Sequence, residues 1–289
     1  MKRIGTINGT REILEENGFF MKKKFGQNFL IDQNILTGIV TKAGINKEIN
    51  VIEIGPGIGS LTEHLIENAA HVISYEIDDT LIPILKKQFG HNENFTLLHT
   101  DILKADIKND IKTYFKNDYP VYVVANLPYY ITTPIIMHLL ENVEEVRRYA
   151  VMVQLEVADR ITANKGGKDY NNLTIAIGYR AKVHKALTVS RNVFMPKPNV
   201  DSAVVVFDIY DEKPYKAKNE KFFIELVRNS FANRRKTLVN NLNQAYHLPK
   251  EELAALLEEL NISSTIRSEA LSIEQFITLA DILETKIKK

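Results

Sequence analysis

Residues 126–129 carry the groups best suited to chemistry on a planar base. Asn126 brings a side-chain carbonyl and Leu127 a backbone carbonyl, while Pro128 lacks an N–H and Tyr129 offers a flat aromatic face. Two acceptors beside a stacking ring suit a base that bears an amino group. Accepted hydrogen bonds would draw the amine of adenine toward tetrahedral geometry and localise its lone pair, so no strong base is required. The alternative is a strand-to-loop exit with a capping Asn and a turn Pro.

A glycine-rich turn lies upstream, directly after another predicted strand. Gly55, Gly57 and Gly59 form a Gly-x-Gly-x-Gly pattern, and an acidic residue, Glu53, stands two positions before it. Glycines let the backbone turn sharply and approach a ligand without an intervening Cβ. The dinucleotide fingerprint would require a glycine at position 60, where this chain has Ser. The pattern is instead the form found in enzymes that use S-adenosylmethionine (SAM).

Four predicted strands end in succession on groups that can hold a ligand, namely Gly55, Glu76, Asp101 and Asn126. Glu76 follows Gly55 at the spacing where a carboxylate meets ribose hydroxyls. Asp101, with Ile102 beside it, is placed to accept from the adenine amine of a cofactor. Helical runs separate the strands, at about 59–69, 78–89 and 102–116. This alternation predicts an α/β fold, a Rossmann-like and mostly parallel sheet with crossover helices.

The second half of the chain predicts an edge to this sheet and then a helical domain. A fifth strand at 149–154 is followed by strand-like runs at 173–178 and 203–207, which should form an antiparallel edge pair. Residues 194–198 between them predict a rigid exposed turn, in which Phe194 either stacks on a ligand or packs in the core. After a linker at 211–218 the pattern is helical. The expected helices lie at about 219–231, 234–245, 250–259 and 272–286.

Composition bounds the class of protein. The 289 residues are 45% hydrophobic and 25% charged, as in a globular protein with one large and one small domain. The absence of cysteine excludes disulfides, thiolate zinc sites and the covalent thiol route to pyrimidine methylation. No metal site is expected. No long apolar run or signal-peptide pattern is present, which indicates a cytoplasmic protein without a membrane segment.

Two basic triplets stand out against a net charge of only +1. Lys22, Lys23 and Lys24 precede the first motif, and Arg234, Arg235 and Lys236 are expected at a helix start. The helix macrodipole disfavours cations at that position, so an anionic partner such as RNA phosphate is indicated. For either triplet the alternative is a solvated surface without a partner.

Together these patterns resemble the ribosomal RNA adenine N6-dimethyltransferases, and within that family the bacterial enzymes of the small subunit. The resemblance runs from about residue 23 to 240 with its motifs in order. They are Gln27-Asn28-Phe29-Leu30-x-Asp32, Glu53-x-Gly55-Pro-Gly57-x-Gly59-x-Leu61-Thr62, Glu76, Asp101, Asn126-Leu-Pro-Tyr129, Gln154-x-Glu156-Val157 with Arg160, Phe194-x-Pro196-x-Pro198-x-Val200-Asp201-Ser202-Ala203, and Phe231-x-x-Arg234-Arg235-Lys236-Thr237-Leu238.

The resemblance implies a function and three domains. The reaction would be SAM-dependent dimethylation of two adjacent adenosines in a hairpin near the 3′ end of 16S rRNA, with the immature 30S subunit as partner and the enzyme a monomer. The domains would be an N-terminal extension (1–21), a methyltransferase domain (22–210) and a helical RNA-binding domain (211–289). No role is expected for residues 1–20.

The resemblance also implies site residues. Asn28 and Leu30 would close over the cofactor, and Gly55 and Gly57 would lie under its methionine part. Glu76 would bind the ribose hydroxyls, and Asp101 with Ile102 the cofactor adenine. Asn126 to Tyr129 would hold the flipped target base, with Asn126 on its amine and Tyr129 stacked on its ring, and Phe194 would cover the other face. Asn126 would also contact the cofactor. The two basic triplets, Lys22 to Lys24 and Arg234 to Lys236, would bind RNA.

Three other functions are weighed. A large-subunit methyltransferase of the macrolide-resistance (Erm) type shares the motif but often has Ile where Leu127 stands, with a different C-terminal domain. A DNA adenine methyltransferase would need a duplex-recognition domain, for which residues 211–289 are few. A non-catalytic ribosome-assembly factor would not need Glu76, Asp101 and Asn126 intact, and all three are present.

Overall fold

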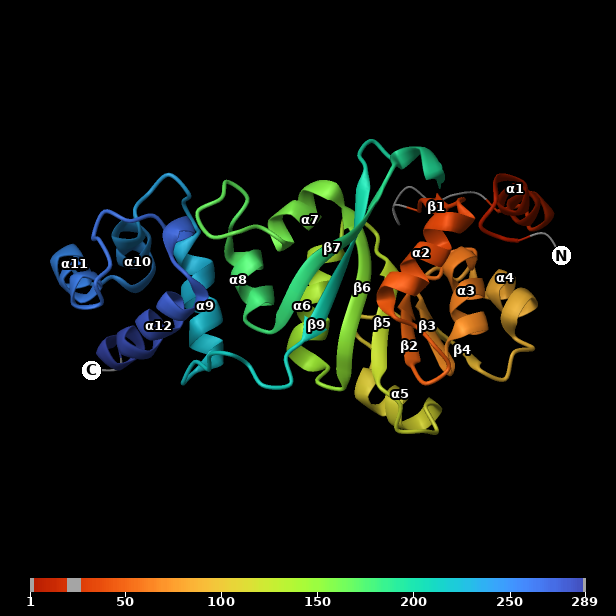
Figure 1. Cartoon of the computed structure of the whole chain (residues 1–289), viewed down its shortest axis with the longest axis horizontal. Helices are drawn as coiled ribbons and strands as arrows, with labels where there is room; N and C mark the ends of the chain where they lie inside the picture. Colours follow the sequence, from red (N-terminus) through yellow and green to blue (C-terminus); the bar gives the residue numbers. More distant parts are fainter. Residues whose placement is uncertain (1–2, 20–26, 288–289) are drawn as a thin grey trace. The chain divides into compact units, whose positions relative to one another are not determined.

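The computed structural model describes residues 3–19 and 27–287, which form two compact units (Figure 1). The first, here the sheet unit, takes the chain up to Ala158 and again Val183–Ile209. The second, here the helical unit, takes Asp159–Lys182 and the chain from Tyr210 onward. The chain passes from the sheet unit into the helical unit for the last time after Ile209, next to the domain boundary expected at 210. The segment 159–182 was expected in the first domain but lies in the helical unit, because Tyr170, Ile175 and Tyr179 are buried in that unit's core.

The sheet unit contains a mostly parallel seven-stranded sheet, which confirms the predicted fold class. Strand order is β4-β3-β2-β5-β6-β9-β7, with β4 to β6 parallel to one another and β9 antiparallel to β6. In chain order the strands are β2 (Asn50–Ile54), β3 (His71–Glu76), β4 (Phe95–His99), β5 (Val121–Asn126), β6 (Val146–Gln154), β7 (Ala181–Val189) and β9 (Ser202–Ile209). Two short strands, β1 (Phe29–Leu30) and β8 (Phe194–Met195), form a separate antiparallel pair.

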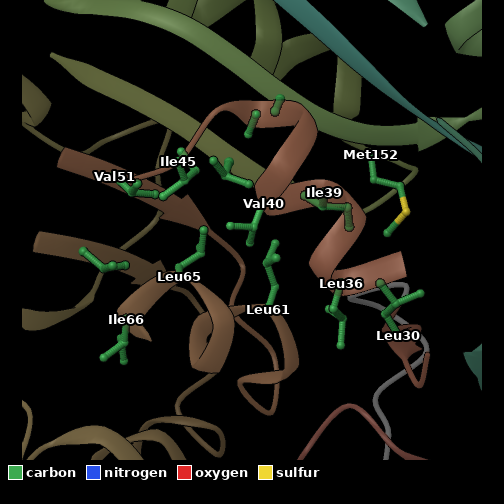
Figure 2. Close-up of a cluster of buried hydrophobic side chains, with 14 of the residues drawn as sticks. Leu30, Leu36, Ile39, Val40, Ile45, Val51, Leu61, Leu65, Ile66 and Met152 are labelled. Carbon is green, nitrogen blue, oxygen red and sulfur yellow. The ribbon is translucent and has the colours of Figure 1, made fainter. Parts of the chain in front are cut away.

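Helix α2 (Gln33–Ala43) precedes the first strand of this sheet, and one helix follows each of the strands β2 to β6. These are α3 (Ser60–Asn68), α4 (Ile82–Phe89), α5 (Ile107–Tyr114), α6 (Thr132–Asn142) and α7 (Leu155–Ile161). Figure 2 shows how α2 and α3 cover one face of the sheet: Leu36, Ile39 and Leu65 interlock between Val51 of β2 and Met152 of β6. These side chains are almost fully buried, so the glycine turn between β2 and α3 rests on a packed layer.

The N-terminal residues, for which the sequence indicated no role, pack on this layer. Helix α1 (Ile7–Glu16) is capped by Thr6, and Ile4 before it is buried in the same core cluster. Arg3 pairs with Glu67 of α3 at 2.9 Å. Phe19 after the helix lies against Phe29 of β1, with ring centroids 6.3 Å apart. The extension therefore supports β1 from outside.

The predicted strand at 173–178 is wrong: these residues form helix α8 (Asn172–Gly178), and the edge strand is β7 instead. Asn171 caps the helix, accepting from the N–H groups of Leu173 at 2.8 Å and Thr174 at 3.3 Å, while its own N–H donates to Thr174 Oγ1 at 3.1 Å. The residues from Thr174 to Ile177 are all buried. A short segment buried on every side shows no helical period, so its branched side chains suggested a strand.

The helical unit contains the four predicted C-terminal helices, α9 (Glu220–Ser230), α10 (Leu238–Tyr246), α11 (Lys250–Glu259) and α12 (Ile273–Ile287). Arg234, Arg235 and Lys236 were expected at the start of the second of these helices. They instead precede its N-cap, Thr237.

No helix within residues 3–19 and 27–287 is both long and apolar enough to cross a membrane.

Replacing Asn171 by Ala should lower the free energy of unfolding by about 1 kcal/mol, because α8 loses its N-cap. Asn172→Ala is the matched control, since that neighbouring side chain is exposed and makes no cap. Urea unfolding of both variants measures the difference. Equal stability of the two variants would contradict the role assigned to Asn171.

Candidate active site

A cavity opens at the carboxyl ends of the parallel strands, where the strand order reverses between β2 and its neighbours β3 and β5. This is the position at which open α/β sheets bind ligands. Its walls come from β1, the ends of β2 to β5, and helices α2 and α6. Most of the residues proposed from the sequence for cofactor and target line it together: Asn28, Leu30, Gly55, Gly57, Glu76, Asp101, Ile102, Asn126, Leu127, Pro128 and Tyr129.

Glu76 lies at the end of β3 with its carboxylate held against the glycine turn. Oε2 accepts from the Gly57 N–H at 3.3 Å and Oε1 from the Asp78 N–H at 2.8 Å. The side chain is buried, and this burial raises the pKa of Glu76, while the backbone donors act in the opposite direction. Each carboxylate oxygen can accept more than one hydrogen bond, so Glu76 can still bind ligand hydroxyls.

Glu53 is buried on β2 and also lines the cavity. Its Oε2 accepts from Thr62 Oγ1 at 2.8 Å and from Ser74 Oγ at 2.6 Å, whereas the buried Oε1 has no partner within the described residues. Burial raises the pKa of Glu53 to about 7, and the nearby charge of Glu76 adds to the effect. The cavity floor therefore holds an unsatisfied acceptor beside a second carboxylate, which suits a ligand that brings a hydrogen-bond donor and a positive charge.

Residues 27–30, here called the strap, line the cavity and contact other parts of its wall. The Asn28 carbonyl accepts from Asn126 Nδ2 at 3.2 Å. Gln27 Nε2 donates to Asp78 Oδ2 at 2.7 Å, and the Phe29 ring packs on the turn, so that a methyl group at Gly57 would lie 3.1 Å from it. Because the amide nitrogen of Asn126 donates to the strap, its Oδ1 is the atom that can accept from an amine in the cavity.

The contacts around the end of β5 indicate which backbone carbonyl could accept a hydrogen bond from a ligand. The Leu127 N–H donates to the Met152 carbonyl at 3.2 Å, which fixes the orientation of that strand end. The Pro128 carbonyl accepts from the Ile131 N–H at 3.2 Å and from Thr132 Oγ1 at 3.0 Å. The start of α6 thus uses the Pro128 carbonyl, which leaves the Leu127 carbonyl as the acceptor for a base.

Several cavity residues were not proposed from the sequence as site residues, and two of them are largely exposed. Ile77 and Tyr130 both line the cavity and are 47% and 59% exposed. Ile77 directly follows the strand-end acid Glu76, as Ile102 follows Asp101. This repeated Ile could have predicted Ile77 as a cavity residue. Partial burial, together with the nearby charges of Asp101 and Glu76, raises the pKa of Tyr130.

The exposed-turn prediction for Phe194 is wrong. Phe194 is 3% exposed, pairs with Leu30 through β8 and belongs to the core cluster of the sheet unit. Among the described residues, the walls of the cavity do not include it. Its neighbours Pro196 and Lys197 are exposed, but strand pairing turns the ring inward. A contact between Phe194 and a base stays a prediction that would require this segment to rearrange.

The basic triplets are only partly placed. Lys22, Lys23 and Lys24 lie outside the described residues. Arg234, Arg235 and Lys236 are exposed in the helical unit, where Arg234 donates to the Lys168 carbonyl and Lys236 Nζ donates to Gln244 Oε1 at 3.2 Å. Over 3–19 and 27–287, no three His, Asp or Glu side chains gather as a metal site would require.

Comparisons with known proteins agree with this geometry. The family described as "Ribosomal RNA adenine dimethylase" matches residues 18–285. "Ribosomal RNA small subunit methyltransferase A" of Lactococcus lactis subsp. lactis is 50% identical over 282 residues, which cover 97% of this chain and 96% of the relative.

Two solved structures are similar over most of their length. A dimethyladenosine transferase from Plasmodium falciparum superposes with a TM-score of 0.72 at 28% identity, covering 90% of this chain and 98% of that one. The 23S rRNA methyltransferase ErmE gives a TM-score of 0.67 at 25% identity, covering 89% and 99%.

Gly55→Ala and Gly59→Ala should separate ligand binding from folding. Both glycines have positive φ, but a methyl group at Gly55 meets open space in the cavity, whereas one at Gly59 lies 2.3 Å from the Phe89 ring. Gly55→Ala should weaken SAM binding by about tenfold or more with a stability loss of about 1 kcal/mol, and Gly59→Ala should cost about 3 kcal/mol. Calorimetric titration and urea unfolding measure the two effects. SAM affinity of Gly55→Ala equal to that of the parent would exclude a ligand at this turn.

Glu53 should make folding stability depend on pH. Its folded-state pKa of about 7 exceeds the ordinary value of 4.5, so the folded protein holds the proton more tightly than the unfolded chain. The stabilisation is therefore present below about pH 4.5 and is lost as the pH rises to about 7. Relative to Glu53→Gln, which keeps the acceptor for Thr62 and Ser74, the parent should lose up to about 3 kcal/mol between pH 5 and 8. Urea unfolding of the parent and of Glu53→Gln across this pH range measures the difference. Free energies of unfolding that change equally with pH in both proteins would contradict this role of Glu53.

Proposed function

This chain belongs to the ribosomal RNA adenine dimethylase family, and we propose that it transfers methyl groups from SAM to the N6 amines of two adjacent adenosines in the 3′ hairpin of 16S rRNA. One observation carries the proposal: family residues for cofactor and target come from well-separated segments of the chain, yet line one cavity. The full-length similarity to a relative named for the small subunit favours that RNA.

The cavity residues fit the cofactor. Glu76 would accept from the ribose hydroxyls, and Asp101 from the adenine amine, with Ile77 and Ile102 beside the ring. The open space above Gly55 and the orphaned Oε1 of Glu53 suit the methionine part, which carries donors and a positive charge. When bound, SAM supplies a methyl group on a sulfonium, which needs no further activation.

At the base end, the chain contributes alignment. Asn126 Oδ1 and the Leu127 carbonyl would accept the two N6 hydrogens, so the nitrogen lone pair points away from both acceptors and toward the cofactor end. The ring of Tyr129 would stack on the flipped adenine, whose removal from its stack exposes the amine. Asn126 is uncharged and takes no proton. After the first transfer only one N–H remains, and the two acceptors then share it.

The partner is proposed to be 16S rRNA within the immature 30S subunit, bound through phosphates. Arg234, Arg235 and Lys236 are exposed cations in a position to contact such phosphates, and Lys22, Lys23 and Lys24 carry the same charge. The enzyme is proposed to act as a monomer.

The second candidate is methylation of the large-subunit RNA, favoured by the similarity to ErmE. Methyl transfer from tritiated SAM to purified small and large subunits of a strain that lacks these modifications distinguishes the two. Dimethyladenosine recovered from the small subunit by nuclease digestion supports the proposal. Label in the large subunit would instead support methylation of the large-subunit RNA. Absence of label in both would indicate a non-catalytic assembly role.

Asn126→Ala should lower the rate of methyl transfer to small subunits by about 10²- to 10³-fold, since one of the two acceptors of the amine is lost. SAM affinity should fall by a smaller factor, because the variant loses the hydrogen bond to the strap but keeps Glu76 and Asp101. Asn142→Ala, an exposed Asn at the end of α6, is the matched control. Single-turnover transfer and calorimetric titration give both quantities. An unchanged transfer rate would remove Asn126 from the reaction.

A further inference from the structure

Ser202 is a fully buried residue at the start of β9 that lies behind the base end of the cavity. Its Oγ is 2.7 Å from the hydroxyl of Tyr129, 73 positions earlier in the chain. Tyr129 lines the cavity, whereas Ser202 is not among the lining residues of the described chain. The contact therefore joins an aromatic wall of the site to a residue with no access to the substrate.

The Ser202 end of this contact is rigid. Ser202 pairs with Gln154 in the β6–β9 ladder. The residue before it, Asp201, accepts from the Leu155 N–H through its carbonyl and from the Arg191 N–H through Oδ1, both at 2.9 Å. A side chain on such a strand has little freedom, so its hydroxyl is a fixed point for Tyr129.

The Tyr129 backbone is fixed from the other side. Pro128 restricts its own φ, and its carbonyl is held by Ile131 and Thr132. The remaining freedom of Tyr129 is rotation about its two side-chain torsions, which the bond to Ser202 restricts. The neighbouring Tyr130, 59% exposed, shows how differently an adjacent ring can be placed in the same turn.

We propose that Ser202 is a positioning residue for methyl transfer, which sets the plane of the Tyr129 ring and thereby the plane of the stacked target adenine. The inference rests on the proposed function. Stacking aligns N6 with Asn126 Oδ1 and the Leu127 carbonyl during both transfers. It matters more in the second, because a monomethylated amine offers the two acceptors a single N–H. Loss of the contact should therefore slow the second transfer more than the first.

The test compares Ser202→Ala, Tyr129→Phe and the double variant in methyl transfer to unmodified small subunits, with mono- and dimethyladenosine quantified separately. Each single variant should lower kcat for the second transfer by about 2- to 10-fold and raise the monomethyl share. The double variant should resemble either single variant, because both remove the same bond. The KM for SAM should not change, since the contact lies at the base end.

Tyr149→Phe, a buried ring on β6, and Ser190→Ala, an exposed cap, are the matched controls and should keep the parental product ratio. Tyr129→Phe keeps the ring and removes only the hydroxyl, so it tests the contact even if Ser202→Ala folds poorly. A parental product ratio in Tyr129→Phe, or a double variant with the product of both single losses, overturns the proposal. An inactive parent overturns the proposed function instead.

Discussion

The hydrogen bond from Asn126 Nδ2 to the Asn28 carbonyl joins the two halves of the site. It connects the end of β5, where the base is expected, to the strap, which lines the cavity where the cofactor is expected. An amide has one donor group and one acceptor, so use of the donor on the strap assigns the acceptor to the substrate. The conformation of the strap and the orientation of the Asn126 amide therefore depend on each other, although 98 positions separate Asn28 and Asn126 in sequence.

The cavity contains two buried carboxyl groups, and burying them costs free energy of folding. Burial of Glu53 and Glu76 disfavours their ionised forms and raises the pKa of each. Hydroxyls from Thr62 and Ser74 and backbone donors from Gly57 and Asp78 offset part of that cost. Thr62 lies on α3, whose buried side chains pack with those of α2 in the layer shown in Figure 2. A local excess of carboxylate is thus stabilised by the rest of the sheet unit.

The sequence predicted the features that are local. A short apolar strand that ends on Glu76, Asp101 or Asn126 is visible within a few residues, and parallel strands bring such ends together. Features set by distant contacts were not predictable. The inward turn of Phe194 depends on pairing with Leu30, and the bond between Ser202 and Tyr129 joins segments far apart in sequence. Helix α8 was mistaken for a strand because burial on all sides removes the periodicity that distinguishes the two.

The chemistry of the cavity limits what it can select. Two carbonyl acceptors and a stacking ring suit an unpaired adenine amine, but on the proposed function they would make no contact that distinguishes the nucleotides around it. Two adjacent adenosines in one loop present the same group to Asn126 and Leu127. Choice of the RNA would therefore come from contacts outside the cavity, where exposed cations such as Arg234 and Arg235 are proposed to bind phosphates whose positions depend on RNA shape. On the proposed function, the cavity would determine which atom is methylated, and the surface would determine which loop presents it.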